Sequence, residues 1–205
     1  MYKAISIFFL ISFSMSGFGQ IIFPSQPGLT VIPKTEIKWS ANLLTWSLFR
    51  PISDTSLIKV VGAKKIKAKA ATTTAITANF SCHENIFHYE VLAFFSLKQS
   101  WVLKQAQSDT LLLRHEQLHF NISELYARKI RKYLAEYKNP CGKEKEIKNF
   151  VDSLKQAERV ENDIYDIQSA HSTDKIMQKK WEEKVIKEMQ ELKFYINASG
   201  QQKIN

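Results

Sequence analysis

The pattern of hydrophobic and polar positions changes its period near residue 110. Before this point, apolar and polar residues alternate through a threonine-rich stretch at 65–80, which predicts a strand or a bent pair of strands. Residues 87–97 are almost continuously apolar and aromatic, as in a strand that is buried on both faces. Strands followed by helices predict an α+β fold, with a mostly antiparallel N-terminal sheet and a C-terminal helical part.

Three helices are expected after the strands, because apolar residues there recur at steps of three and four. The first covers residues 110–137, with Ser108 or Asp109 as its N-cap and the turn at 139–142 as its stop. The others cover 143–169 and 173–194. Their apolar stripes predict core contacts by Phe150, Val151, Leu154, Ile164, Ile167, Ile176, Trp181, Val185, Met189 and Leu192.

The N-terminus has the pattern of a secretory signal peptide over residues 1–19, with a lysine, an apolar run and small residues at the cleavage site. Residues 20–36, broken by prolines, predict an extended linker or edge segment. A single domain is expected over 37–195, with a polar, frayed tail at 196–205. The run at the N-terminus is too short for a permanent transmembrane helix, so we expect a secreted or periplasmic protein with no membrane span after cleavage.

Composition and charge narrow the class of partner. The chain is 44% hydrophobic and 12% aromatic, which argues against disorder. Its formal charge of +9 favours anionic partners such as cell-envelope polymers or acidic substrates. Nucleic acid is not expected, since the lysines between Lys64 and Lys69 alternate with apolar residues as on the solvent face of a strand.

The chain has two cysteines, Cys82 and Cys141. Export to an oxidising compartment would favour a disulfide between them, tying the end of a strand to the end of the first helix. The alternative is a pair of buried, unpaired thiols. A metal site at Cys82-His83 is less favoured, because adjacent residues on a strand point to opposite faces.

The strongest chemical signal is His115-Glu116-Gln117-Leu118-His119, an H-E-x-x-H motif within the first predicted helix. Helical spacing brings both imidazoles to one face, where they can bind one Zn²⁺ ion while Glu116 flanks it. The alternative is an amphipathic helix that carries two histidines by chance.

A catalytic zinc ion usually takes a third protein ligand and keeps one open position. His171 is the first candidate and Asp166 the second, because both lie where the second helix ends. If His171 is the ligand, Asp166 would accept a hydrogen bond from its ring and so orient it. Glu124 and His88 are less suitable candidates.

Several further segments accompany the motif: residues 44–49, Ser100-Trp101, residues 114–120 and 124–128, and Tyr165, Asp166, Ser169, His171, Gln178 and Trp181. Together they resemble a family of bacterial secreted proteins, domain of unknown function 922, which is described as zinc-dependent proteases. The resemblance covers residues 37–181 and implies a zincin-like peptidase. Leu48 and Leu118 depart from the usual pattern without removing a ligand or the base.

These observations predict a secreted zinc metallopeptidase acting on a peptide or protein substrate. Glu116 would be the general base for a metal-activated water, and Tyr165, or else Tyr126, would stabilise the oxyanion. The alternative function is a non-catalytic, zinc-stabilised module that binds the cell envelope.

Overall fold

The computed structural model of the chain describes residues 35–40, 44–53, 58–61 and 64–204. The predicted signal peptide, and the predicted linker as far as Lys34, lie outside these residues. Within the described ranges, no helix combines the length and the apolar character needed to cross a lipid bilayer.

The largest sheet is built around one long strand, β7 (Ile86–Ser96), whose partners are all antiparallel. These partners are β6 (Thr74–His83) along one edge, and β1 (Glu36–Lys38) and β9 (Ser199–Lys203) along the other. The β6–β7 turn consists of Glu84 and Asn85, with φ of 50° and 60°, as a two-residue type I′ hairpin requires. Residues 91–95 of β7 are all buried, which confirms the predicted burial for this part of the strand, whereas residues 88–90 are only half-buried.

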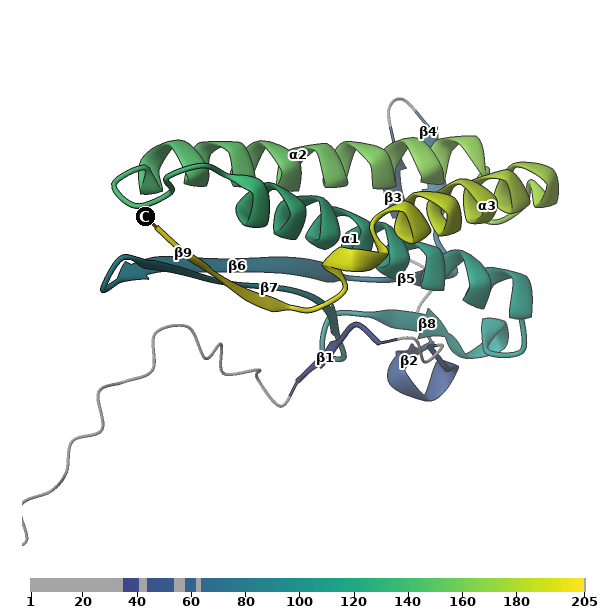
Figure 1. Cartoon of the computed structure of the whole chain (residues 1–205). Helices are drawn as coiled ribbons and strands as arrows, with labels where there is room; N and C mark the ends of the chain where they lie inside the picture. The colour runs from purple at the N-terminus through teal and green to yellow at the C-terminus, as the bar shows by residue number, and fades with distance from the viewer. Residues whose placement is uncertain (1–34, 41–43, 54–57, 62–63, 205) are drawn as a thin grey trace, which may run out of the picture.

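Two smaller sheets lie near one end of the large one (Figure 1). In the first, β8 (Trp101–Leu103) pairs in parallel with β2 (Arg50–Ile52) and antiparallel with β5 (Ala70–Ala71). In the second, β3 (Ile58–Val61) pairs antiparallel with β4 (Lys64–Lys67). The stretch at 65–80 is therefore divided among three strands, in three different sheets.

The helical part consists of α1 (Thr110–Glu136), α2 (Glu144–Gln168) and α3 (Lys175–Glu191). Short 3-10 turns precede or follow these elements: η1 (Trp46–Leu48), η2 (Lys104–Ala106) and η3 (Lys193–Tyr195). All helix ends lie within three residues of the sequence prediction, and the α+β class is confirmed.

Helix α1 is the centre of the fold, because it packs against the sheet on one side and against α2 and α3 on the other (Figure 1). Phe120, Ala127 and Ile130 belong to the core shared with the sheet. Leu118 and Ile122 belong to a second core shared with the other two helices. A helix buried on both sides is held rigidly, so side chains near its N-terminal end have a fixed place.

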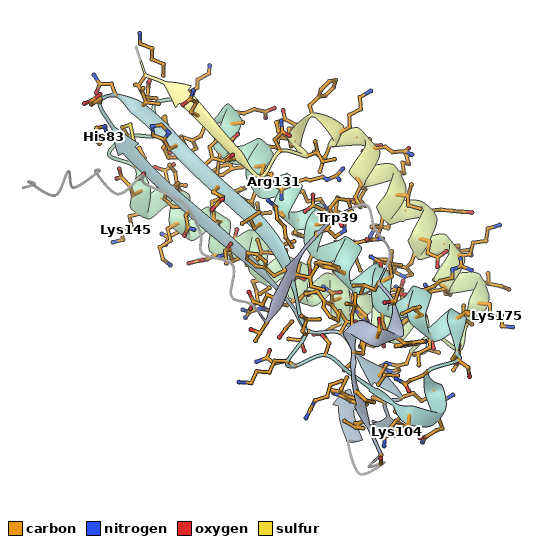
Figure 2. All side chains as sticks on the ribbon, turned by 90° about the horizontal axis from the view of Figure 1, so that it is seen from below. Trp39, His83, Lys104, Arg131, Lys145 and Lys175 are labelled. Atoms are coloured by element: carbon orange, nitrogen blue, oxygen red, sulfur yellow. A yellow bond between two sulfur atoms is a disulfide. The ribbon has the colours of Figure 1, made fainter. Side chains whose placement is uncertain are left out.

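A buried ionic cluster joins α1 to the sheet and to the C-terminal segment. Arg131, labelled in Figure 2, donates to the Val91 carbonyl oxygen at 2.9 Å, to the Tyr195 carbonyl oxygen at 3.1 Å and to Glu124 at 2.8 Å. Arg128 also binds Glu124, at 3.0 Å, and the two arginines and Glu124 are all nearly inaccessible to solvent. The cluster therefore gives each of its buried charged groups hydrogen-bond partners while it ties three parts of the chain together.

Two sequence expectations are wrong. The tail does not fray from residue 196, because Ser199–Lys203 form β9 on the edge of β7. The apolar stripes of α2 and α3 are also not uniformly buried, although Val151, Trp181, Val185 and Met189 are. Exposed members are Phe150 at 43%, Ile164 at 41%, Ile167 at 59% and Ile176 at 71% of their full surface.

The predicted disulfide is confirmed: Cys82 at the end of β6 is bonded to Cys141 in the turn between α1 and α2. The bond fastens one end of the helical layer to the sheet beneath it.

Candidate metal centre

The H-E-x-x-H residues lie in the second and third turns of α1, just after a well-defined helix start. Asp109 is the N-cap, and its Oδ1 accepts a hydrogen bond of 2.9 Å from the backbone N–H of Leu112. The unbroken helix places the rings of His115 and His119 one turn apart, with centroids separated by 4.8 Å. Both side chains face α2.

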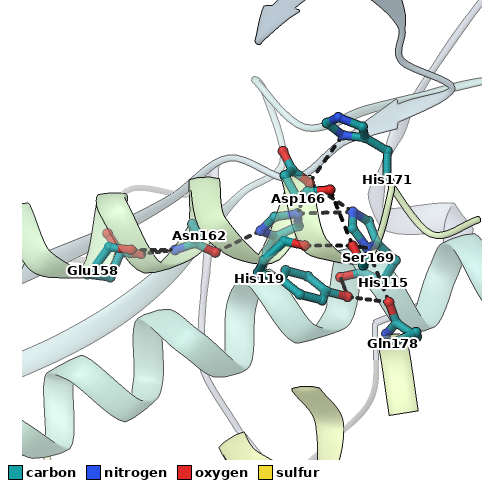
Figure 3. A network of polar contacts seen from close by, with 9 residues as sticks. His115, His119, Glu158, Asn162, Asp166, Ser169, His171 and Gln178 are labelled. Atoms are coloured by element: carbon teal, nitrogen blue, oxygen red, sulfur yellow. Dashed lines mark hydrogen bonds and ion pairs between the residues drawn. The ribbon is translucent and has the colours of Figure 1, made fainter. Parts of the chain in front are cut away.

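Asp166, near the C-terminal end of α2, completes the group. Its Oδ1 is 3.0 Å from His115 Nε2 and 3.1 Å from His119 Nε2, and the two Nε2 atoms are 3.2 Å apart (Figure 3). Zinc bonds of about 2.0–2.1 Å in tetrahedral geometry place ligand atoms about 3.3–3.4 Å from one another. The three atoms therefore have nearly the spacing of three ligands around one ion, and this group is close enough to bind a metal.

The Nδ1 atom of each ring, which faces away from Asp166, has a separate hydrogen-bond partner. His119 Nδ1 is 2.7 Å from Asn162 Oδ1, and His115 Nδ1 is 3.3 Å from Gln178 Oε1. An amide oxygen only accepts, so each ring donates through Nδ1–H and presents the lone pair of Nε2 to the centre. Two lone pairs and a carboxylate oxygen thus converge on one point, and this arrangement requires a cation.

Without a metal ion, a proton is the cation available. Burial alone would lower the pKa of His119, but the hydrogen bond that the protonated ring donates to Asp166 and the charges of Asp166 and Glu116 raise this pKa above its ordinary value. The same anionic surroundings that retain a proton would also attract a metal ion.

Glu116 is 3% exposed, and its Oε2 has no hydrogen-bond partner within the described part of the chain. A buried carboxylate oxygen without a partner is costly unless it binds water or a cation. Glu116 also lines a cleft of about 460 Å³ together with all three residues of the candidate group. The residues present therefore fit a metal ion with a water molecule beside Glu116.

The cleft lies between α2, α1 and the chain that carries β5. Residues 68–74 form one wall, and 158–166 of α2 and the loop 170–173 form the other. Glu158 of that wall is part of a polar chain, since its Oε1 accepts from Ser123 Oγ at 2.6 Å and from Asn162 Nδ2 at 2.8 Å. Burial raises the pKa of Glu158 despite these hydrogen bonds.

His171, our first candidate for the third ligand, lies beside the group and outside its compact centre. Its Nδ1 is 3.5 Å from Asp166 Oδ1, and its backbone N–H donates to the Asp166 carbonyl oxygen at 2.9 Å. The structure thus brings the second candidate, Asp166, into contact with both motif histidines, and His171 into contact with Asp166.

The two tyrosines suggested as oxyanion stabilisers are not among the described residues that line the cleft. Tyr165 is fully buried; its ring stacks on His115 at 4.7 Å and its hydroxyl donates to Gln178 Oε1 at 2.6 Å. The hydroxyl of Tyr126 donates to Glu161 at 2.6 Å. Both tyrosine hydroxyls have a partner inside the fold, and burial raises both pKa values.

The sequence indicates no role for Asn162, and Gln178 enters only as one of the residues that carry the family resemblance. A signal for Asn162 was present, because it precedes Asp166 by one helical turn and so shares its face of α2. Gln178 had no such local signal, since it comes from α3 and only the packing of the helices brings it to His115.

Comparison of the chain with protein-family models, with curated proteins and with solved structures finds no significant match.

Proposed function

We propose that the protein is a zinc-dependent metallopeptidase, as the resemblance to domain of unknown function 922 implies. The observation that carries this proposal is the convergence of His115 Nε2, His119 Nε2 and Asp166 Oδ1. Two imidazoles and one carboxylate at tetrahedral spacing suit zinc better than calcium or magnesium, which prefer sites made only of oxygen. The unpartnered Glu116 oxygen in the same cleft favours a catalytic role over a purely structural one.

Zinc in this site would act as a Lewis acid on a peptide carbonyl and lower the pKa of a bound water. Glu116 then accepts a proton from the attacking water and returns it to the leaving nitrogen as the C–N bond breaks. His115, His119 and Asp166 hold their positions throughout. Because the cleft is lined on one side by extended chain at residues 68–74, a peptide in extended conformation is the substrate class that fits.

Export of the chain is part of the same proposal. The disulfide between Cys82 and Cys141 supports an oxidising compartment, which agrees with the signal-peptide pattern at residues 1–19. Zinc, a disulfide and a peptidase motif are mutually consistent in a secreted or periplasmic protein.

The first test is the zinc content of purified protein by elemental analysis. Wild type should retain one zinc ion per chain, whereas His115→Ala and Asp166→Asn should lose it. His171→Ala should retain zinc, because His171 lies outside the compact group. A wild-type protein that binds no zinc even after reconstitution would overturn the proposal.

The second test separates catalysis from binding. Incubation with a mixed peptide library, followed by mass spectrometry, should show cleavage by wild type and a loss of about 10²–10⁴-fold in Glu116→Gln. That variant has the same shape and should keep its zinc. If wild type holds zinc but cleaves nothing, the protein is instead a zinc-stabilised binding module.

A further inference from the structure

Asn162 and Gln178 are the partners of the two ligating imidazoles, and each is fixed from its outer side. The Nδ2 of Asn162 donates to Glu158 Oε1 at 2.8 Å and to the Glu158 carbonyl oxygen at 3.1 Å. A carbonyl oxygen can only accept, so the NH₂ group must face Glu158. The amide oxygen is therefore turned to His119, at 2.7 Å.

Gln178 is fixed in the same way from α3. Its Nε2 donates to Glu182 Oε1 at 3.0 Å, and Arg114 holds the Glu182 carboxylate with two contacts. The hydroxyl of Tyr165 donates to Gln178 Oε1. Because the glutamate accepts and the tyrosine donates, the amide oxygen faces His115. Gln178 is 1% exposed, so water does not compete for these bonds.

Each imidazole is thus oriented by a neutral amide, and each amide in turn donates a hydrogen bond to a glutamate. Many zinc sites place a carboxylate directly behind the histidine, which fixes the tautomer and makes the ring a more basic ligand. An amide fixes the tautomer without adding negative charge. With Asp166 as the anionic ligand, a divalent ion in this group keeps a formal charge of about +1.

We propose that Asn162 and Gln178 are positioning residues that hold His115 and His119 in the Nδ1–H tautomer, and that they do so without placing a carboxylate directly behind either ring. This proposal rests on the proposed metal site but not on the identity of any substrate. With neutral amides behind both rings, the ion would remain a strong Lewis acid. A catalytic zinc ion needs this property, and a structural zinc ion does not.

Removal of each acceptor tests the positioning. Gln178→Met and Asn162→Leu should each weaken zinc binding by about 10–100-fold, measured by competition with a chromophoric chelator. Proton–nitrogen correlation spectra of the zinc-loaded protein should show Nδ1–H on both rings in wild type and a disturbed signal for the ring that lost its acceptor. Unchanged affinity and spectra in both variants would overturn the proposal.

An exchange of amide and carboxylate tests the charge. Gln178→Glu with Glu182→Gln, and Asn162→Asp with Glu158→Gln, keep the same groups and total charge but move the negative charge next to the ring. Zinc should then bind at least as tightly as in wild type. In the cobalt-loaded protein, the pH midpoint of the visible spectrum should rise. An unchanged midpoint in both exchanges would contradict the charge argument.

Two controls make the outcomes separable. Gln156→Glu adds a carboxylate to an exposed position of α2 and should change neither zinc affinity nor the midpoint. Circular dichroism confirms that each variant is folded. If wild type itself binds no metal, the proposed function fails as well; if wild type binds zinc and the variants match it, this inference alone fails.

Discussion

His119 is the residue at which proton and metal compete most directly. Its ring is largely buried, and burial alone would lower its pKa, yet Asp166 and Glu116 raise that pKa above the ordinary value of 6.5. A folded-state pKa above the unfolded one means that the folded protein binds the proton more tightly. Metal binding must displace this proton, so the stability of the protein and its affinity for zinc are linked through pH.

This linkage predicts that the free energy of unfolding changes with pH in opposite directions with and without zinc. In the metal-free protein, His119 contributes stability that is fully present below pH 6.5 and is lost as pH rises through its raised pKa. In excess zinc, the free energy of unfolding should instead rise over that interval, because the ligand becomes available. Urea unfolding between about pH 6 and pH 9, in EDTA and in zinc, measures both.

His83 provides the control for this prediction, because it is an exposed histidine at the tip of the β6–β7 hairpin. His83→Gln should leave both profiles unchanged. A metal-free profile without any slope in this interval would show that the His119–Asp166 pair does not hold a proton.

At the residue scale, the sequence predicts those site residues whose positions depend only on the geometry of one helical turn. His115, Glu116 and His119 follow from spacing alone, since four residues along a helix bring two side chains together. The sequence does not determine whether His171 or Asp166 is the better third ligand, because this depends on how the chain turns after α2. There Asp166 is still helical and points at α1, whereas His171 has a left-handed φ of 51° and lies at the side.

At the element scale, the end of α2 shapes one wall of the cleft. The backbone N–H of Ala170 donates to Ile167 and that of His171 to Asp166, a Schellman arrangement in which Ala170 takes the left-handed position usually given to glycine. Ala170, His171 and Ser172 all have positive φ, from 46° to 75°. Such conformations are costly for residues with a Cβ. Three strained residues in a row beside the candidate site indicate that the site depends on the position of this loop.

Ala170→Gly should therefore raise the free energy of unfolding by about 1 kcal/mol, because glycine adopts this φ without the Cβ clash. The matched control is Ala157→Gly in the middle of α2, which should lower it by about 1 kcal/mol or more. Urea unfolding of both variants against wild type provides the measurement. If both substitutions destabilise the protein, Ala170 is not strained.

The helices were predicted well because their ends carry local signals, such as the Asp109 cap and the turn at 139–142. Strand β9 carries no such signal. Its sequence, Ser199–Lys203, is polar, and it forms because the edge of β7 offers main-chain partners. Gly200 fits there because a Cβ at that position would overlap the ring of Tyr89. Hydrophobic periodicity also does not show which apolar face of a helix packs against another element. Burial was therefore predicted for Ile167 and Ile176, which are exposed.

At the scale of the whole molecule, the candidate site needs all three helices in register. Its ligands come from α1 and α2, and Gln178 comes from α3, so residues separated by as many as 63 positions must meet. The Arg131 cluster and the disulfide hold the opposite end of the same layer. The site lies near the start of α1 and Cys141 lies just beyond its end, which puts roughly 30 Å of helix between them.

This distance predicts that metal and disulfide stabilise the fold independently. The disulfide closes a loop of 59 residues, for which the chain-entropy account gives about 4 kcal/mol. Zinc at a thousand times its dissociation constant would add a similar amount, about 4 kcal/mol. Urea unfolding of wild type and of Cys82→Ser/Cys141→Ser, each in zinc and in EDTA, should give two contributions that add within about 0.5 kcal/mol.

A coupled result would have a definite meaning. If the cysteine variant loses its zinc under conditions where it is still folded, the disulfide is needed to hold α2 against α1 at the site. The long packed interface of α1 with both neighbouring helices argues against this outcome, because Leu118, Ile122 and Leu125 lie in its buried core close to the ligands and far from the disulfide. Additivity would show that local packing alone keeps the three ligand atoms in place.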